Sequence, residues 1–384
     1  MGNNYLYRVS SINFNLFDFM QTLYWPMNNK SAKNKSNMEL EIFEQTNIIK
    51  NLIEKYITKE NYILINLPLI IKKVFLIASG SSYHCAYIAA EMLKESVNCD
   101  AEAIYASEFS INPHNQVDET TLYIFISQSG ETSDTLQALK EIARKTDNIL
   151  CVTNNKDSTL WQLSSYKVLT HAGKEKSIAS TKAMSAQLFC LYLIVLKILY
   201  SKNIDITADL AQIHNLPTHI SNVLDSAKNI KKIAKKLSEF DNISILGSKY
   251  FYALAKEGAL KIKETSYINT CAYPHGEFMH GHVAILNKKA AIISIMDELH
   301  KNQMLKNLKS IRNDYKPYLV SIFNYETIDE NYSLSNHNIK IPTDTNVFAI
   351  FGTLITLQLL ALEIAKVLKK NIDKPTGLKK VVIN

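Results

Sequence analysis

Hydrophobic and polar positions follow two alternating periods along most of this chain. Met38 opens "MELEIFEQTNIIKNLIEKYI", whose apolar residues recur at helical spacing and predict an amphipathic helix. From residue 74, short apolar runs each lead through a polar loop into a helical pattern, as in "KVFLIASGSSYHCAYIAAEMLKESV" and "LYIFISQSGETSDTLQALKEIARK". Further elements are expected in this half: strands at 148–155 and 167–173 and a long helix from about Ser180. Strands that alternate with helices predict an α/β fold with a parallel sheet and right-handed crossovers.

The same layout recurs in the second half of the chain. "ISILGSKYFYALAKEGALK" (243–261) repeats the first strand, loop and helix, with Gly247 at the position of Gly80. That offset takes Ser127 to Ser294, where the apolar strand in "AAIISIMDE" ends. The remaining elements of the second set are two strands and an apolar helix, at 317–323, 338–343 and 346–369. A repeat this long indicates two copies of one domain, of which only the first keeps the hydroxyl-rich loop.

These patterns divide the chain into four parts. They are an extension at 1–37, a first α/β domain with its leading helix at 38–215, a second at 216–370, and a tail at 371–384. The extension is expected to be flexible, because its aromatic residues lack a clear period and a basic polar stretch follows them. The alternative expectation is that Met38 is the true first residue of the protein.

Composition is that of an ordinary soluble globular protein, with 47% hydrophobic and 21% charged residues. The formal net charge is +7, and part of the basic excess lies in short lysine runs. Such runs are typical of solvated helix faces, so no nucleic-acid partner is expected. The five cysteines form no C-x-x-C pair, which indicates neither a disulfide framework nor a thiolate zinc site and fits a reducing cytoplasm. The longest apolar stretches, 188–200 and 347–365, are interrupted by polar residues and predict buried helices rather than membrane spans.

Hydroxyl side chains gather where two strands of the first domain end. "SQSGET" carries Ser127, Ser129 and Thr132, and "SGSS" carries Ser81 and Ser82. Ligands of open parallel sheets bind at the carboxyl ends of the strands, where helix N-termini favour an anion. Two such loops at one crevice predict a phosphate monoester site. The alternative is that these hydroxyls cap helices, as serine and threonine commonly do.

Three further stretches carry candidate chemistry. In a helix, Glu257, Lys261 and Glu264 would share one face, either as a surface ion pair or as a carboxylate beside a cation that moves a proton. "HGEFMHGH" (275–282) lacks the i, i+4 spacing of helical metal ligands, so no metal is expected, but a histidine there is an acid–base candidate. Lys380 in the tail is either solvated or, inside a crevice, able to form an imine with a sugar carbonyl.

Together these stretches resemble the sugar isomerase (SIS) family, in particular the isomerase half of the aminotransferases that make glucosamine 6-phosphate. The resemblance runs from Met38 to the end and rests on "SGSSY", "ASEF", "SQSGETSDTL", "AGKEKSIASTKA", "KEGALKIKETSYI", "GEFMHG" and "DKP…LKK". It implies two tandem doubly wound parallel-sheet SIS domains of the flavodoxin-like α/β sandwich type. It also implies a homodimer with a shared active site.

The resemblance implies a role for each candidate residue. The sugar phosphate would be held by Ser82, Ser127, Gln128 through its backbone, Ser129 and Thr132, with Ser180 near the sugar hydroxyls. Glu264 would move a proton between C1 and C2, His280 would open the sugar ring from across the dimer interface, and Lys380 would form an imine with the ketose C2. Lys261 would lie near the reacting carbons, and Glu257 is assigned to the substrate site with it.

The sequence departs from the family pattern in three places. The bifunctional synthases begin with a glutaminase domain and its N-terminal cysteine, whereas here no cysteine precedes Cys85. Ammonia is therefore expected from solution or from a separate glutamine amidotransferase subunit. His282 stands where the synthases usually have proline, which implies an altered ring-opening loop. The tail "KPTGLKKV" is more similar to that of SIS-type deaminases, which however tend to lack "GET" and "ASTKA".

The function expected from the resemblance is a cytoplasmic phosphosugar isomerase/aminotransferase. It would interconvert fructose 6-phosphate plus ammonia with glucosamine 6-phosphate, without a metal or organic cofactor. The alternatives are a deaminase or deglycase of amino-sugar phosphates and a non-catalytic phosphosugar-binding module.

Overall fold

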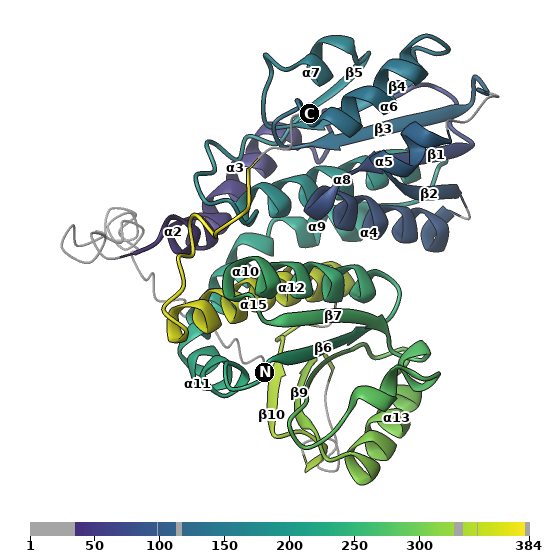
Figure 1. The fold of residues 1–384 in the computed structure, drawn as a ribbon. Coiled ribbons are helices and arrows are strands. Elements are labelled where there is room, and N and C mark those ends of the chain that lie inside the picture. Colours follow the sequence, from purple (N-terminus) through teal and green to yellow (C-terminus); the bar gives the residue numbers. More distant parts are fainter. Residues whose placement is uncertain (1–34, 98, 113–116, 326–332, 344, 381–384) are drawn as a thin grey trace, which may run out of the picture. The chain divides into compact units, whose positions relative to one another are not determined.

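The computed structural model describes residues 35–97, 99–112, 117–325, 333–343 and 345–380. The flexible extension expected at 1–37 lies outside the described residues except at its end, where Asn37 already begins helix α2 (Asn37–Phe43). Both expected α/β domains lie in one unit, Asn37–Asn384. The fold class predicted from the sequence is confirmed, because each domain has a parallel five-stranded sheet with helices around it (Figure 1).

The first sheet has the strand order β2-β1-β3-β4-β5, the flavodoxin-like order of a doubly wound fold. Its strands are β1 (Lys73–Ala78), β2 (Asp100–Tyr105), β3 (Thr121–Ser127), β4 (Ile149–Thr153) and β5 (Tyr166–Leu169). All of its pairs are parallel, and Ala78 lies beside both Tyr105 and Ile126. The carboxyl ends of β1 and β3 therefore meet at one edge of the sheet, which places their two hydroxyl-rich loops together.

Alternate residues of the first sheet pack into two apolar clusters. Val74 and Leu76 of β1 belong to the larger core with α4 and α8, whereas Phe75 and Ile77 pack with α5, α6 and α7 on the opposite face. This alternation follows from the two-residue period of a strand. The helices of this half are α3 (Gln45–Tyr56), α4 (Gly80–Val97), α5 (Ala106–Ile111), α6 (Ser133–Ala143), α7 (Thr159–Leu163) and α8 (Lys182–Ser201).

The second sheet, β10-β9-β8-β6-β7, has the same order as the first when it is read from β7. Its strands are β6 (Asn242–Gly247), β7 (Asn269–Pro274), β8 (Ala291–Met296), β9 (Tyr318–Phe323) and β10 (His337–Lys340). Helix α9 (Thr207–Ile213) still belongs to the first half and lies beside α8, where Tyr192 Oη donates to Asp209 Oδ1 at 2.8 Å (Figure 1). The helices of the second half are α10 (Leu216–Asp225), α11 (Ala227–Leu237), α12 (Tyr250–Ser266), α13 (Lys301–Asp314) and α15 (Asn346–Val367), with short 3-10 turns η2 (Glu277–Met279) and η3 (His282–Ile285). The larger core continues through α12 and α15 to this sheet, and α12 packs against α4 of the first domain.

The register corrects the repeat offset expected from the sequence. Leu246 of β6 pairs with Ser294, just as Ile77 of β1 pairs with Phe125. Ser294 therefore corresponds to Phe125, and Met296 rather than Ser294 occupies the position of Ser127. Matching Gly247 to Gly80 was wrong, because Gly247 is the last residue of a strand whereas Gly80 is the first residue of a helix. A Cβ on Gly247 would lie 2.4 Å from the backbone oxygen of Phe251, so close packing against α12 explains this glycine.

Within the described part of the chain, two helices are long and apolar enough to span a membrane, Lys182–Ser201 and Val347–Val367. In each, 89% of the apolar window is buried inside the protein. This is the burial expected of core helices, which the sequence predicted.

The same correspondence places Lys249 at the position of Gly80 and yields a stability prediction. Lys249 has φ +49° and ψ −129°, a conformation that favours glycine. We expect Lys249→Gly to raise the free energy of unfolding by about 1 kcal/mol, because it removes this backbone strain. Lys249→Ala is the control: it loses the same ion pair to Glu95 but keeps the strain. Urea unfolding of both variants checks the prediction, and equal stabilities would show that the strain is negligible.

Candidate active site

A cavity of about 300 Å3 opens at the carboxyl edge of the first sheet. It is lined by the loops after β1 and β3, the segment before α8, one face of α12 and the C-terminal tail. Its lining residues are Ser79, Gly80, Ser81, Ser82, Ile126, Ser127, Gln128, Ser129, Thr132, Thr135, Glu175, Ile178, Ser180, Leu260, Lys261, Glu264, Leu378, Lys379 and Lys380. Every site residue expected from the sequence lines this cavity except Glu257 and His280.

The loop after β3 is held in a tight turn by its own hydroxyls. Ser127 Oγ accepts a hydrogen bond from the Gly130 amide at 3.1 Å and lies 3.0 Å from Thr132 Oγ1. Ser129 Oγ accepts from the Glu131 amide at 3.1 Å. Gly130 has φ +70°, which glycine adopts at no steric cost. The turn thus brings three hydroxyls to the N-terminal end of α6.

The alternative that these hydroxyls merely cap a helix does not fit α6. Thr132 is the N-cap residue, yet its side chain makes no capping hydrogen bond. Thr135, one turn further on, is 1% exposed, and its Oγ1 has no hydrogen-bond partner among the described residues. Buried hydroxyls are nearly always paired, so the Thr135 hydroxyl at this cavity wall is free to bond a ligand. The sequence analysis missed Thr135, although it lies three residues after Thr132 and hence on the same helix face.

Helix α12 places a buried ion cluster against the cavity. Lys261 Nζ lies 2.5 Å from Glu264 Oε2 and 3.5 Å from Glu257 Oε1, so the shared helix face predicted from the sequence is observed. The side chains of Glu257 and Lys261 are 0% and 1% exposed, whereas that of Glu264 is 20% exposed. Of the two alternatives, the surface ion pair is therefore wrong, since the side chains of Glu257 and Lys261 are buried and only Glu264 is partly exposed to solvent.

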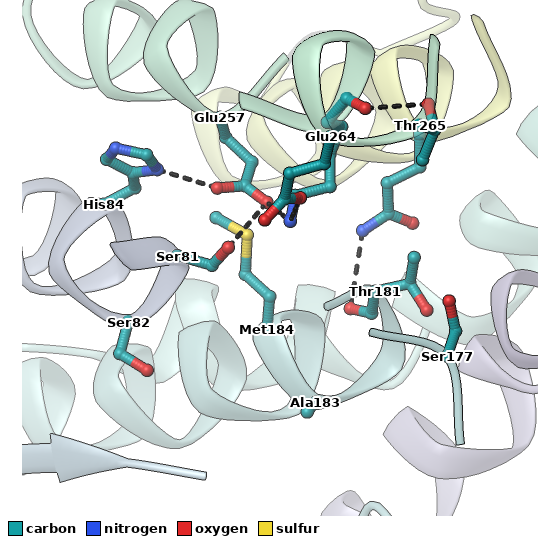
Figure 2. Close-up of polar contacts among 12 residues, drawn as sticks. Ser81, Ser82, His84, Ser177, Thr181, Ala183, Met184, Glu257, Glu264 and Thr265 are labelled. Carbon is teal, nitrogen blue, oxygen red and sulfur yellow. Dashed lines mark hydrogen bonds and ion pairs between the residues drawn. The ribbon is translucent and has the colours of Figure 1, made fainter. Parts of the chain in front are cut away.

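Glu257 lies behind the cavity wall rather than in it. Its Oε1 accepts from Ser81 Oγ at 3.0 Å, and its Oε2 lies 2.7 Å from His84 Nδ1 (Figure 2). Burial alone would raise the pKa of Glu257, but Lys261, His84 and Ser81 hold it below its ordinary value. The carboxylate is thus ionised and joins α12 to α4. Two of its partners, Ser81 and Lys261, do line the cavity.

Lys261 is a stable cation at this site. Burial would lower its pKa, but the carboxylates of Glu257 and Glu264 raise that pKa above its ordinary value. A lysine must lose its proton to attack a carbonyl, so this arrangement suits an electrostatic role for Lys261 rather than imine formation.

The tail brings Lys380 into the cavity, which decides against the solvated alternative. Its ammonium forms an ion pair with Glu175 Oε2 and donates to the Ser177 carbonyl oxygen at 2.8 Å. Several hydrogen bonds anchor the preceding tail: Asp373 Oδ1 accepts from the Met38 amide at 3.0 Å, Asp373 Oδ2 accepts from the Asn37 amide at 2.8 Å, and the Thr376 amide donates to Tyr267 Oη at 2.7 Å.

Comparison with known proteins identifies the fold family. The sequence profile of the SIS domain matches residues 71–197 and again residues 236–367. The chain belongs to the SIS domain family. The two matches correspond to the two sheets and their helices.

The SIS relatives include aminotransferases. Glutamine–fructose-6-phosphate aminotransferase (isomerizing) of Caldanaerobacter subterraneus is 33% identical over 89% of this chain and 58% of its own length, so the chain spans just over half of that relative. A solved C-terminal domain of glucosamine-fructose-6-phosphate aminotransferase from Francisella tularensis has a TM-score of 0.82 at 28% identity, covering 88% of this chain and 98% of that domain. A glucosamine-6-phosphate deaminase from Thermotoga maritima, at 22% identity, has a TM-score of 0.72 over 90% of this chain and 99% of its own, which shows a shared fold.

His280 and its neighbour His282 lie away from the cavity, whereas Ser82 lines it. His280 lies on an exposed turn after β7, between η2 and η3, and it does not line the cavity of its own chain. His282 packs its ring against Tyr273 at a tilt, with centroids 4.5 Å apart, so the residue that stands where the resemblance implies proline contacts β7 through its ring. Ser82 lines the cavity, and its hydroxyl donates to Gln187 Oε1 at 2.9 Å.

Proposed function

We propose that this SIS protein is a phosphosugar isomerase/aminotransferase that interconverts fructose 6-phosphate plus ammonia with glucosamine 6-phosphate. The proposal rests on one observation: a single cavity combines the hydroxyl loop of β3, the carboxylate of Glu264 beside the Lys261 cation, and the amine of Lys380. A sensor of phosphosugars needs only the loop, so the other two groups favour an enzyme.

Each group has a defined task in the proposed reaction. The hydroxyls of Ser127, Ser129 and Thr132 hold the phosphate at the α6 N-terminus, where the helix dipole favours an anion. Lys380 forms an imine at C2 with loss of the carbonyl oxygen as water, and ammonia then displaces the lysine amine from C2, so that the nitrogen of ammonia stays on the sugar. The imine at C2 makes the C1 hydrogens more acidic. Glu264 then carries a proton between C1 and C2, and the Lys261 ammonium stabilises the negative charge that develops between them.

The proposal includes a second subunit. Because His280 is exposed and lies outside its own chain's cavity, a ring-opening role requires that it enter the cavity of a partner in a homodimer. The nitrogen donor is proposed to be free ammonia or a separate glutamine amidotransferase subunit, and the protein is proposed to work in the cytoplasm.

An activity assay of the purified chain tests the function. Fructose 6-phosphate with ammonium is expected to give glucosamine 6-phosphate, and fructose 6-phosphate with glutamine alone is expected to give none. Glucosamine 6-phosphate offered alone measures the reverse reaction, and a strong preference for it would favour the deaminase alternative that the tail sequence suggests. If neither direction proceeds while the sugar phosphate binds, the chain is a binding module and the proposal fails.

Replacing Gly130 by alanine is expected to weaken fructose 6-phosphate binding at least tenfold. The new Cβ would lie 2.2 Å from Ser158 Oγ and 2.4 Å from Ser158 Cβ, and φ at Gly130 is +70°, so the hydroxyl turn must shift. Gly80→Ala is the matched control: it lines the same cavity with φ +57°, but its Cβ would meet nothing within 4 Å. We expect it to have the smaller effect. Calorimetric titration measures both affinities, and equal losses would show that the clash with Ser158 does not shape the phosphate site.

A further inference from the structure

Glu175 is a cavity carboxylate to which the sequence analysis gave no role. Its side chain is 0% exposed, and its two oxygens have different partners. Oε1 accepts the amide hydrogens of Thr181 at 2.8 Å and Ala183 at 3.1 Å, at the start of α8. Oε2 receives the ammonium of Lys380.

The segment that carries Glu175 is itself held in place. The carboxylate of Glu41 accepts from the Lys176 amide at 2.5 Å and from the Ser177 amide at 3.3 Å. The Ser177 carbonyl oxygen in turn accepts from Lys380 Nζ at 2.8 Å. Lys380 Nζ is therefore fixed between a rigid carboxylate and a rigid carbonyl, and only the carboxylate can take up a proton.

Capping α8 does not require a charge at Glu175. An amide oxygen accepts backbone hydrogen bonds as a carboxylate oxygen does, so glutamine would serve at Oε1. The partner at Oε2 is different, because Lys380 must lose a proton before its nitrogen can attack a carbonyl. The carboxylate in contact with that nitrogen is the group placed to accept this proton.

We propose that Glu175 is the proton acceptor and donor for imine formation by Lys380, an inference that rests on the proposed function. A proton passes from the Lys380 ammonium to Glu175 Oε2, and the freed lone pair attacks the ketose C2 carbonyl. The nitrogen then carries two protons, and one of them moves to the former carbonyl oxygen, which gives a neutral carbinolamine. Glu175 returns its proton to that hydroxyl, which leaves as water while the C2=N bond forms. The ammonium and ketone thus give a protonated imine and water, with no change of oxidation state.

Borohydride trapping with fructose 6-phosphate tests this role in the full chain. The wild-type protein is expected to form an adduct on Lys380, located by peptide mass spectrometry. Glu175→Gln is expected to trap about 100-fold more slowly near neutral pH, in the range that general acid–base groups contribute. Its trapping rate should also rise tenfold per pH unit, because hydroxide from the solvent must then remove the lysine proton. A merely structural role would leave the shape of the pH profile unchanged.

Glu44→Gln is the matched control. Glu44 also faces a lysine at the start of α8, with its Oε2 2.6 Å from Lys182 Nζ, but it does not line the cavity. This variant is expected to keep the wild-type trapping rate within twofold. If Glu175→Gln unfolds, Glu175→Asp keeps a carboxylate at the position and should trap more slowly with the pH profile of the wild type.

The outcomes separate the two proposals. A wild-type adduct on Lys380 with an unchanged rate and pH profile in Glu175→Gln overturns the role of Glu175 alone. A Glu175→Asp protein whose rate rises tenfold per pH unit overturns it as well. A wild-type protein that forms no adduct overturns the imine step of the proposed function, and the role of Glu175 with it.

Discussion

Glu264→Gln is expected to lower turnover about 1,000-fold while fructose 6-phosphate binds with nearly unchanged affinity. The amide keeps the shape of the side chain and can still meet Lys261, whose Nζ lies 2.5 Å from Glu264 Oε2 in the native protein. It cannot carry a proton between C1 and C2, and general acid–base groups contribute about 100- to 10,000-fold to rates. The phosphate loop of β3 is untouched, so binding should persist.

Two measurements and one control make this test specific. Calorimetric titration gives the affinity for fructose 6-phosphate, and incorporation of deuterium from solvent water at C1 or C2 reports the proton transfer directly. Glu239→Gln is the control, because Glu239, in the turn after α11, pairs with Lys236 at the same i, i+3 spacing and both side chains are exposed. Native turnover in Glu264→Gln would remove Glu264 as the base, and a loss of binding instead of turnover would make it a sugar-binding group.

The sequence predicted the buried strands of both sheets and the edge strands β5 and β10, but not the edge strands β2 and β7. The strands predicted as apolar runs are the buried ones, such as β3 and β8, in which every position is buried. β2 and β7 were missed because they lie at sheet edges and are mostly half-exposed or exposed, so "DAEAIY" and "NTCAYP" lack a continuous apolar run. An edge strand has only one neighbour, and its pairing depends on tertiary contacts that no local pattern encodes.

In the candidate site, too, groups within one loop or one helix could be predicted from the sequence, whereas contacts between distant segments could not. The loop hydroxyls and the Glu257–Glu264 face follow from spacing within one loop and one helix, and the structure places them as expected. Glu257 was assigned to the substrate site together with Lys261, but its carboxylate contacts Ser81 and His84 of the other domain. The pairing of Glu175 with Lys380 joins segments far apart in the chain, and no sequence spacing predicts it.

Lys261→Met is expected to lower the free energy of unfolding by about 3–5 kcal/mol, the usual cost of removing one partner from a buried ion pair. The Glu257 side chain is 0% exposed, and without Lys261 its charge keeps only the hydrogen bonds of His84 and Ser81. The double variant Lys261→Met/Glu257→Gln removes the stranded charge and should recover much of this loss. Urea unfolding of the single and double variants measures the difference.

The free energy of unfolding should depend on pH with opposite signs in the wild type and in Lys261→Met. In the wild type the folded pKa of Glu257 is below its ordinary value of 4.5, so its contribution to stability is present above that pH and is lost as the pH falls through the folded pKa. In Lys261→Met burial is no longer offset by the lysine, and the folded pKa of Glu257 is expected to rise above that of the unfolded chain. The folded variant then binds a proton more readily than the unfolded chain, so its deficit should shrink as the pH falls from 7 toward 5. A deficit that stays constant over this range, or that persists in the double variant, would show that lost packing of the lysine stem rather than a stranded carboxylate destabilises the protein.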